Sequence, residues 1–392
     1  MLLTALLMLV VTVNTGSTSV KLAAFTAGAE TLTRVAQERH SDGKLSPQTV
    51  LESFQSGLPE APAAIAHRVV HGGTKFPGPV RIDPDVRAAI EQLSELAPLH
   101  NPHALEWIDA AREAFGAQAV AVAVFDTSFF FSLPRVAAEY AVPRNLGVEQ
   151  GVRRYGFHGL AHEGMWRRWC QLRPKLPKGG RLISLQLGGG CSVAAIHQGR
   201  PLDISMGFSP LEGLVMATRS GDIDAAVVSH LQRRLDTTSD HIITLLNNES
   251  GICGLTGGRT DLGSLVTEGS EEDRFALELY CYRARKYVGA YLAVLGGCDG
   301  IVFGGGVGEH VPEVRSRILD GMSWAGIELD PLSNNAARGR EARLDAAKDA
   351  VQLWVVPTEE EPLLAQAALD TLSGVVPPSQ EAPGPPGVPA PP

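Results

Sequence analysis

The sequence contains few cysteines, and their spacing matches neither a metal site nor a redox pair. No C-x-x-C segment is present, which excludes the common zinc and dithiol motifs. The number of cysteines is odd and they lie far apart, so a disulfide framework is not expected either. The thiols are Cys170, Cys191, Cys253, Cys281 and Cys298. We therefore expect reduced cysteines and a cytoplasmic protein.

Clusters of basic residues are also lacking. Lys and Arg together number 34, against 43 Asp and Glu, and the net charge is −9. Proteins bind nucleic acids through clustered Lys and Arg side chains that replace counterions. No nucleic-acid partner is therefore expected.

No apolar segment at the start of the chain is long enough to span a bilayer. The opening thirteen residues, MLLTALLMLVVTV, resemble the hydrophobic part of a signal peptide. They lack a basic segment before the apolar run and a small-x-small cleavage site after it. We expect a buried first strand, translation from Met1 or Met8, and no membrane partner.

What the sequence does contain is a regular alternation of two patterns. Short β-branched runs alternate with segments of helical period, which is typical of an α/β fold. With 392 residues, 44% of them hydrophobic, the chain can form two domains of ordinary size. The segment 374–392 is rich in proline and is expected to be a disordered tail. The expected strands are Val10–Val13, Ala64–Val70, Ala119–Phe125, Leu182–Leu187, Gly300–Phe303 and Val351–Val356. The expected helices are Pro84–Leu96, Ala104–Phe115, Ala225–Leu235, Glu271–Leu295 and Val311–Trp324.

Three segments rich in Gly and Ser follow expected strands. The first, NTGSTSVK, begins at Asn14; the second is Gly188–Gly190; the third, FGGGVGEH, spans Phe303–His310 and precedes a helix expected near Val311. Backbone N–H groups in such turns and at helix N-termini bind anions. A G-x-G-x-x-G motif followed by an acidic residue about twenty positions later is not found, so a dinucleotide fold is disfavoured. The recurrence predicts phosphate binding, and the first two segments suggest two related lobes.

Charged side chains interrupt apolar surroundings at a few positions. Arg68 lies in a β-rich run, and Asp126 follows an expected strand at the carboxyl end, where α/β proteins place their chemistry. Alone, each of these residues would be interpreted as part of a structural ion pair. Together with a second arginine expected beside a strand, Arg219, and with His158 in glycine-rich surroundings, they are typical of a clamp for a small anion and a transferring phosphoryl group.

A zinc site is not favoured by the sequence. His158 and His162 have the i, i+4 spacing of a metal pair, but Gly159 between them suggests a loop. No third ligand lies nearby in the sequence.

Nine segments resemble the acetate kinase family, in the same order and with comparable separations. They cover roughly Val10 to Ala368. The segments are VNTGSTSVK, HRVVHGG, LAPLHNP, VFDTSF, RRYGFHG, SMGFSPLEGLVMATRSGDID, YVGAYLAVLGGCDGIVF, GVGEH and VPTEEE. The resemblance implies an α/β protein with two related lobes of the actin-like ATPase (ribonuclease H-like) fold and a nucleotide cleft between them. The lobes would be 1–125, completed by 359–373, and 126–358. A homodimer is also implied, with the helix 271–295 as a candidate interface.

The activity that the resemblance implies is reversible, Mg²⁺-dependent transfer of the γ-phosphoryl group of ATP to acetate, giving acetyl phosphate and ADP. Mn²⁺ is an alternative metal. A carboxylate is already ionised at pH 7, so catalysis needs positioning and charge neutralisation more than a strong base. Propionate or butyrate kinase activity and a nucleotide-binding switch with little turnover are the alternatives. A sugar kinase fits less well, because the motifs around Arg68 and His158 supply cations and no base for a neutral hydroxyl.

The resemblance also implies roles for individual residues. Arg68 and Arg219 would bind the carboxylate and the transferring phosphoryl oxygens. Asp126 would orient the magnesium shell or the substrate, and His158 would donate a hydrogen bond in the transition state. The residues that match the family's magnesium positions are Asn14 and Glu360.

Two further sets of residues match the family's substrate sites. The small apolar pocket for the acyl group, which favours acetate or propionate over longer acids, would be lined by Val70, Leu99, Phe157 and Pro210. The nucleotide and its phosphates would contact Ser17, Ser19, Lys21, Gln186, Leu187, Gly188, Gly189, Gly190, Asp261, Leu262, Gly263, Gly306, Val307, Gly308, Glu309 and His310.

The chain departs from the family pattern at five positions. Gln186 replaces a usual histidine, and it can donate a hydrogen bond but cannot become cationic. Gly263 replaces an arginine of the adenosine site, which removes a planar group able to stack on a base. The other departures are Gly189 and His310 in place of asparagine, and Phe130 in place of histidine. The choice of nucleotide is therefore left open, whereas the clamp residues are intact.

Overall fold

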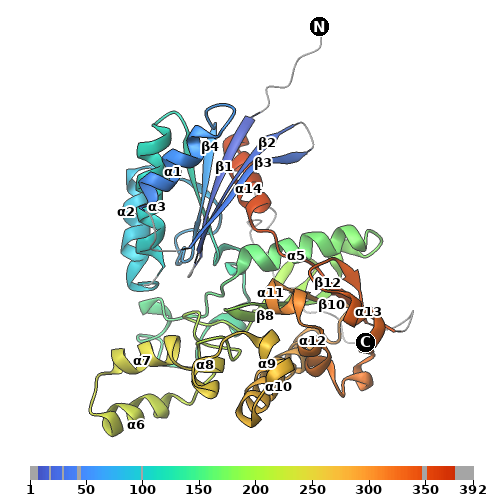
Figure 1. Cartoon of the computed structure of the whole chain (residues 1–392). Coiled ribbons are helices and arrows are strands. Elements are labelled where there is room, and N and C mark those ends of the chain that lie inside the picture. Colours follow the sequence, from blue (N-terminus) through green and yellow to red (C-terminus); the bar gives the residue numbers. More distant parts are fainter. Residues whose placement is uncertain are drawn as a thin grey trace. The chain divides into compact units, whose positions relative to one another are not determined.

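The computed structural model describes residues 8–16, 19–28, 31–41, 46–98, 100–346 and 351–375. They form two compact units, one made of the described residues up to Ser132 and from Glu359 onward, the other of Leu133–Thr358. Each unit contains a six-stranded mixed sheet with helices, so the predicted α/β fold class is confirmed (Figure 1). The predicted start at Met1, the loop residue Ser17, the pocket residue Leu99 and the tail after residue 375 lie outside the described residues.

The sheet of the first unit has the strand order β3-β2-β1-β4-β6-β5. Strands β1, β2 and β3 form an antiparallel meander, β4 and β6 run parallel to β1, and β5 is antiparallel to β6. The two parallel strands therefore end at the same edge as β1, which gathers their carboxyl ends. The strands are β1 (Met8–Thr15), β2 (Ser19–Ala27), β3 (Leu32–Ser41), β4 (Ala64–Val69), β5 (Val80–Arg81) and β6 (Val120–Phe125).

The first glycine-rich segment is the turn of a hairpin. Thr15 of β1 pairs with Val20 of β2, and the backbone N–H of Gly16 donates to the carbonyl oxygen of Ser19 at 2.9 Å. Lys21, expected in a loop, lies within β2 opposite Asn14. The sequence did not predict β2 and β3, because β2 begins among turn-forming residues and β3 carries many polar side chains.

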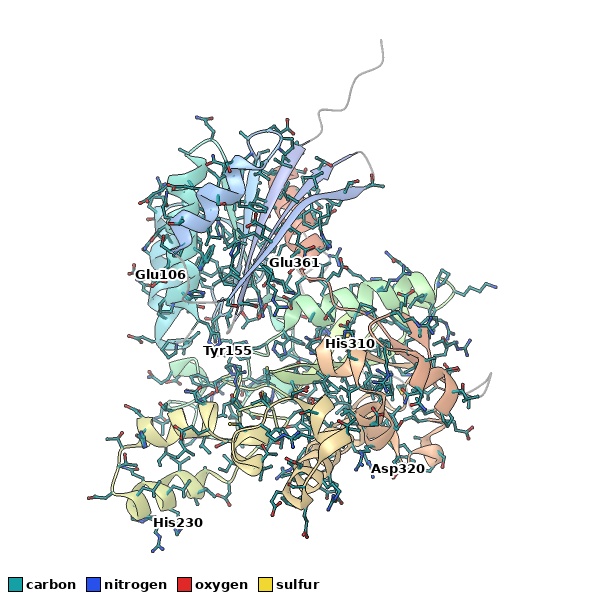
Figure 2. The ribbon with its side chains drawn as sticks, in the orientation of Figure 1. Glu106, Tyr155, His230, His310, Asp320 and Glu361 are labelled. Carbon is teal, nitrogen blue, oxygen red and sulfur yellow. The ribbon has the colours of Figure 1, made fainter. Side chains whose placement is uncertain are left out.

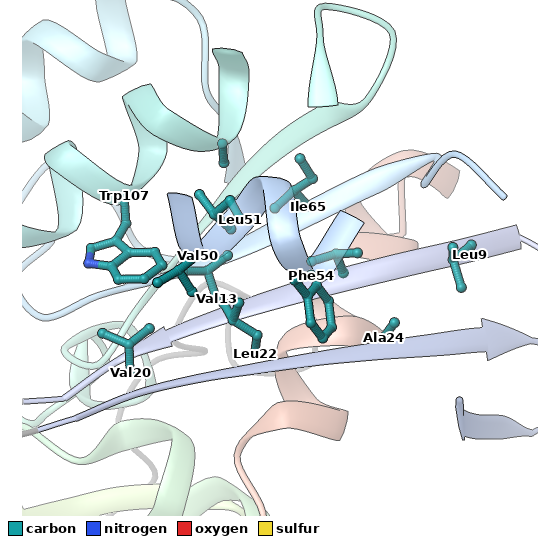
Figure 3. Close-up of a cluster of buried hydrophobic side chains, with 12 residues drawn as sticks. Leu9, Val13, Val20, Leu22, Ala24, Val50, Leu51, Phe54, Ile65 and Trp107 are labelled. Atoms are coloured by element: carbon teal, nitrogen blue, oxygen red, sulfur yellow. The ribbon is translucent and has the colours of Figure 1, made fainter. Parts of the chain in front are cut away.

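Helices cover both faces of the first sheet. Helices α1 (Pro47–Ser56), α2 (Pro84–Gln92) and α3 (Asn101–Phe115) lie on one side, and α14 (Glu361–Ser373) packs on the other side against β1 and β4 (Figure 1). Two side chains cap helices at their N-termini: Ser46 accepts from Thr49 N at α1, and Asp83 accepts from Val86 N at α2. The apolar stripe of α1 packs on β1 and β2 in a buried cluster (Figure 3) of Leu9, Val11, Val13, Val20, Leu22, Ala24, Val50, Leu51, Phe54, Ile65, Trp107 and Ala111.

The sheet of the second unit repeats the topology of the first. Its order is β11-β12-β10-β7-β8-β9, with a meander of β7, β8 and β9, two strands parallel to β7, and β11 antiparallel to β12. The strands are β7 (Arg181–Leu187), β8 (Cys191–His197), β9 (Arg200–Ile204), β10 (Gly300–Gly304), β11 (Ala342–Arg343) and β12 (Gln352–Val355). The turn between β7 and β8 is the second glycine segment, at the position that the Gly16 turn has in the first sheet.

The helices of the second unit also lie on both faces of its sheet. Helix α5 packs against β7 and β10, and α10 packs against β8. Helix α10 begins with a capping box between Ser270 and Asp273; its inner side is buried, whereas Phe275 and Tyr282 are about half exposed. The helices are α4 (Arg135–Ala138), α5 (Gly159–Leu172), α6 (Ala225–Leu235), α7 (Ser239–Asn248), α8 (Gly251–Thr256), α9 (Leu262–Glu268), α10 (Glu271–Leu295), α11 (Gly305–His310), α12 (Pro312–Leu319) and α13 (Pro331–Ala336). Short 3₁₀ helices are η1 (Leu93–Glu95), η2 (Ser128–Phe130), η3 (Val148–Gln150), η4 (Pro177–Gly179) and η5 (Ser323–Ala325).

Two expectations about glycine segments were wrong. The loop expected around Gly159 is the first turn of α5, because the reversal of the chain occurs one residue earlier, at His158. The third glycine segment is the short helix α11, since the turn from strand to helix is made by Gly305 alone, at φ +76°. Within the described ranges, none of the helices is both long and apolar enough to cross a membrane.

Candidate active site

A buried arginine–aspartate pair lies at the carboxyl end of the first sheet. Arg68 of β4 donates from Nε to Oδ1 of Asp126 at 3.0 Å and from Nη2 to Oδ2 at 2.7 Å. Asp126 directly follows β6, the parallel neighbour of β4, and so lies within reach of the guanidinium. The side chains are 13% and 2% exposed. A buried bidentate ion pair of this kind fixes the orientation of the guanidinium.

The same arginine joins β1 to the start of α14. Arg68 Nη1 donates to Oδ1 of Asn14 at 3.2 Å and lies 3.5 Å from Oε2 of Glu360. Asn14 in turn donates from Nδ2 to Glu360 and to Glu361, each at 2.9 Å. Nζ of Lys21 lies 3.3 Å from Oε1 of Glu361, which is labelled in Figure 2. Residues distant in the sequence thus form one cluster, which we call the Arg68 cluster.

Burial and neighbouring charges shift the pKa values of Arg68 and Glu361 in this cluster. Burial disfavours the charge of Arg68, but Asp126 and Glu360 outweigh it, and the pKa of Arg68 lies above its ordinary value. Burial likewise opposes ionisation of Glu361, yet Lys21 and Asn14 hold the pKa of its carboxyl below the ordinary value. The cluster contains three acidic and two basic side chains, so its formal charge is −1.

The cluster suits a hydrated magnesium ion better than a fully enclosed metal. Among the residues that the structure describes, no three His, Cys, Asp or Glu side chains form a ready-made metal site. Mg²⁺ usually keeps several waters and takes only one or two carboxylates besides the phosphates of a substrate. The hard oxygen donors of Asn14 and Glu360 and the surplus negative charge fit such an ion.

In the second unit, His158 and Arg219 meet at the second glycine segment. A methyl group added at Gly190 would lie 3.2 Å from Cε1 and Nε2 of His158 and 3.6 Å from Nη1 of Arg219. Only a glycine leaves that space open. The structure therefore brings together two of the predicted catalytic residues and the predicted phosphate turn.

A chain of hydrogen bonds holds His158 in place. Its Nδ1 lies 2.9 Å from Oγ of Ser192, which lies 2.7 Å from Nε2 of His162, and Nδ1 of His162 lies 2.9 Å from Oγ of Ser184. Burial and the neighbouring His158 keep the pKa of His162 well below its ordinary value, so this ring is neutral. Both nitrogens of His162 contact hydroxyls, an arrangement that differs from the metal pair considered above. The backbone of His158 has φ +60°, a left-handed conformation that is uncommon outside glycine and clusters at functional sites.

Arg219 differs from Arg68 in having no carboxylate beside it. Its Nη1 donates to the carbonyl oxygen of Pro210 at 3.2 Å, and it forms no ion pair within the described part of the chain. Burial lowers the pKa of Arg219 below its ordinary value, with a smaller opposing effect from Cys191. A half-buried guanidinium without a counter-charge favours the approach of an anion.

Hydrogen bonds from outside the third glycine segment hold it in place, and the sequence analysis did not predict them. Oε1 of Glu309 accepts from the backbone N–H groups of Gly305 and Thr358, both at 3.0 Å. The fully buried Arg315 donates to the carbonyl oxygen of Gly308 at 2.7 Å. Burial lowers the pKa of Arg315 to about 10. The bond of Glu309 to Gly305 fixes the N-terminus of α11, and Arg315 holds its C-terminal part. A nucleotide contact of Glu309 or of its neighbours Gly306, Val307 and His310 stays a prediction.

Some residues predicted to bind the nucleotide stabilise the fold in this structure. Asp261 caps α9, accepting from Gly263 N at 3.1 Å and Ser264 N at 3.2 Å, and Leu262 is buried. Gln186 lies on β7, and its buried Oε1 has no hydrogen-bond partner in the described chain. An unsatisfied amide oxygen at a predicted phosphate site leaves room for a water or a ligand donor.

The residues predicted for the acyl pocket are divided between the units. Val70 lies in the first unit and is buried; Phe157 and Pro210 lie in the second, where Phe157 is buried and Pro210 is half-buried. Their shared role stays a prediction.

The sequence analysis did not identify the side chains that hold the predicted site residues in position. Ser192 and His162 support His158, Glu361 shares Asn14 with Glu360, and Arg315 supports α11. Two of them had a signal in the sequence: Glu361 is the third acid of VPTEEE, and His162 has the i, i+4 spacing to His158. The others act across elements distant in sequence, which spacing does not reveal.

Comparisons with known proteins agree with the motifs. Residues 48–366 match the model of the acetokinase family. An acetate kinase of Solibacter usitatus is 44% identical over 333 residues, covering 83% of this chain and 80% of the relative. The crystal structure of Porphyromonas gingivalis acetate kinase superposes with a TM-score of 0.84 at 33% identity, over 93% of this chain and all of that one. A propionate kinase from Francisella tularensis superposes with a TM-score of 0.82 at 30% identity, over 94% of this chain and all of that one. With a matching family model over most of its length and relatives above 40% identity, the chain belongs to the acetokinase family.

Proposed function

We propose that this protein is an acetate kinase, which transfers the γ-phosphoryl group of ATP reversibly to acetate and forms acetyl phosphate and ADP. The observation that carries the proposal is the convergence of His158 and Arg219 at Gly190. These two groups supply hydrogen-bond donors, and no carboxylate in the described chain forms an ion pair with Arg219. Such a place suits the oxygens of a phosphoryl group in transfer.

In this proposal the two side-chain clusters have different tasks. Arg68, held by Asp126, binds the carboxylate of the acceptor and orients it for attack. His158 and Arg219 bind the phosphoryl oxygens as their charge develops, and the Ser192 hydroxyl keeps the ring of His158 in position. No group needs to remove a proton, because the attacking carboxylate is already ionised.

The metal would belong to the Arg68 cluster. Asn14 and Glu360 would hold Mg²⁺, which neutralises part of the phosphate charge when bound. Mn²⁺ takes the same oxygen donors and is the alternative. The homodimer implied by the family resemblance stays a prediction, which light scattering of the purified protein checks.

The test is the formation of acyl phosphate from ATP and Mg²⁺ with acetate, propionate or butyrate, trapped as the hydroxamate. Arg219→Ala should lower kcat/KM by about 1000-fold, or roughly 4 kcal/mol, because it removes a donor to the transition state. Arg234→Ala, an exposed arginine of α6 in the same unit, is the matched control and should leave kcat/KM unchanged.

Comparison of the three acceptor acids distinguishes acetate kinase activity from propionate or butyrate kinase activity. Similarity to a propionate kinase makes propionate the second candidate, so turnover is compared at equal concentrations of the acids. GTP in place of ATP tests the change at Gly263. Binding of ATP without acyl phosphate from any acid would contradict the proposal and favour a nucleotide-binding switch.

A further inference from the structure

A pocket lies in the first unit, on the face of the sheet that carries α2 and α3. It has a volume of about 370 Å³, in the range of small-molecule sites. Its walls come from α2, α3, β5 and the first residues of β6, and its lining includes His67 of β4. His67 and Arg68 are adjacent on β4, so their side chains point to opposite faces of the sheet. The pocket shares no lining residue with the Arg68 cluster or with the His158 and Arg219 site.

His67 is the unusual group of this pocket. Its side chain is 1% exposed, and neither ring nitrogen has a hydrogen-bond partner in the described part of the chain. Burial lowers its pKa to about 3, with a smaller opposing effect from Asp109, so the ring is neutral at physiological pH. A buried donor or acceptor without a partner destabilises the folded state, so a ligand that supplies the partner is favoured. A neutral imidazole offers one donor and one acceptor, which together match a hydroxyl group.

The charged side chains that line the pocket have a net positive charge. Arg87 and Asp109 neutralise each other through two hydrogen bonds of 2.8 and 2.6 Å, and Asp83 caps α2 by accepting from Val86 N. Arg81 and Arg112 also line the pocket. Neither has an ion pair or a side-chain hydrogen bond among the residues described. A guanidinium group without an ion-pair partner can bind a carboxylate or a phosphate through two parallel hydrogen bonds.

We propose that this pocket binds a small hydroxylated oxyanion, a phosphate or carboxylate that carries hydroxyl groups. Arg81 and Arg112 bind the anionic end, and a hydroxyl of the ligand both donates to and accepts from the ring of His67. The volume of the pocket suits a molecule of about ten non-hydrogen atoms together with some water. The proposal does not depend on the kinase activity, since the two sites share no residue.

Calorimetric titration of the full-length protein with four probes tests the proposal. The probes are glycerol 3-phosphate, glycerate, inorganic phosphate and glycerol. We expect saturable binding of glycerol 3-phosphate or glycerate, at least tenfold tighter than inorganic phosphate and glycerol, and the better of the two hydroxylated anions identifies the anionic group. Equal affinity for inorganic phosphate and glycerol 3-phosphate would overturn the role of His67, and heat from none of the probes would overturn the site.

Variants locate the binding in this pocket. Arg81→Gln and Arg112→Gln should each weaken the tighter probe about tenfold, whereas Arg39→Gln, an exposed arginine on β3 of the same unit, should not. Unchanged affinity in both pocket variants would contradict the proposal, because the anion would then bind elsewhere.

A second readout avoids substitution of the buried histidine. In protein labelled with ¹⁵N-histidine, the ring nitrogens of His67 should shift on addition of the tighter probe, since both acquire hydrogen bonds. Heat of binding without any shift of these two signals would overturn the contact with His67.

Discussion

Arg68 depends on side chains from three distant parts of the chain. Its guanidinium contacts Asp126 after β6, Asn14 on β1 and Glu360 before α14. A buried ion pair adds little net stability over apolar packing, but loss of one partner leaves a buried charge without compensation. The consequence is that substitutions here change both folding stability and any ligand binding.

We expect Asp126→Ala to lower the free energy of unfolding by about 3–5 kcal/mol, because Arg68 stays buried without its main partner. Urea denaturation measures the change. The control is Asp109→Ala, which breaks the Arg87–Asp109 pair, whose side chains are 33% and 46% exposed, and should cost at most about 1 kcal/mol. Equal losses in the two variants would contradict the importance of burial.

Ser192 is expected to act as a positioning residue for His158. Ser192→Ala removes the hydroxyl between His158 and His162 and should lower kcat about 10–100-fold, the equivalent of a hydrogen bond of about 1.5–3 kcal/mol. KM for acetate should change less than about twofold, and Ser192→Thr should restore part of kcat. Steady-state kinetics measure both parameters.

The control for Ser192 is Ser184→Ala, because Ser184 contacts His162 but not His158. It should affect kcat much less. A larger loss of kcat in Ser184→Ala than in Ser192→Ala would contradict the positioning role.

Two buried histidines, His67 on β4 and His71 just after it, make the stability of the first unit depend on pH. The folded pKa of His67 is lowered to about 3 and that of His71 to about 4, so the unfolded chain binds more protons below the ordinary histidine value of 6.5. Stability from these rings is complete above pH 6.5 and is lost as pH falls toward the folded values.

We expect the free energy of unfolding to fall by up to about 1.4 kcal/mol per pH unit for each ring between pH 6.5 and 4.5. Urea denaturation at several pH values measures the slope. His67→Phe should reduce the slope by about half, whereas His230→Gln, an exposed histidine on α6 that Figure 2 labels, should leave it unchanged. A slope that is the same in wild type and His67→Phe would count against the buried neutral ring.

Elements with a clear hydrophobic period could be predicted from the sequence. Helices α6 and α10 begin and end where their periodicity predicts, because capping residues and a glycine mark their ends. Strand β3 could not be predicted, since an edge strand with many exposed polar side chains lacks the apolar pattern. Helix α5 was obscured by a glycine at its first position.

The site was predictable where charge interrupts an apolar run. Arg68 and Asp126 stand out in the sequence for that reason, and the structure pairs them. The bonds of Asn14 to Glu360 and Glu361 span 346 and 347 positions. No spacing rule relates such residues, so the family resemblance alone suggested Glu360.

The first unit uses both ends of the chain, and its folding should therefore depend on the last helix. Leu364, Ala365 and Ala368 of α14 are fully buried, and α14 packs on β1 and β4. A chain that stops at Thr358 should expose this surface and leave Arg68 without Glu360. We expect faster hydrogen exchange in β1 and β4 of that variant, with β7 and β8 unchanged.

The control for this truncation is a chain that ends at Val375, which keeps every described contact of α14 and should exchange like the full chain. Mass spectrometry of the exchanged peptides measures both variants. Protection of β1 and β4 in the chain ending at Thr358 would show that the first unit folds without α14.

The matching strand orders of the two sheets also bear on ancestry. Each sheet begins with a three-strand meander, continues with two strands parallel to the first, and ends with a short antiparallel strand. Duplication and fusion of one ancestral gene would produce this pattern, and the Gly16 turn and the Gly188–Gly190 turn would then be copies of a single loop. The differences between the two loops would record how the halves of the gene diverged after the duplication.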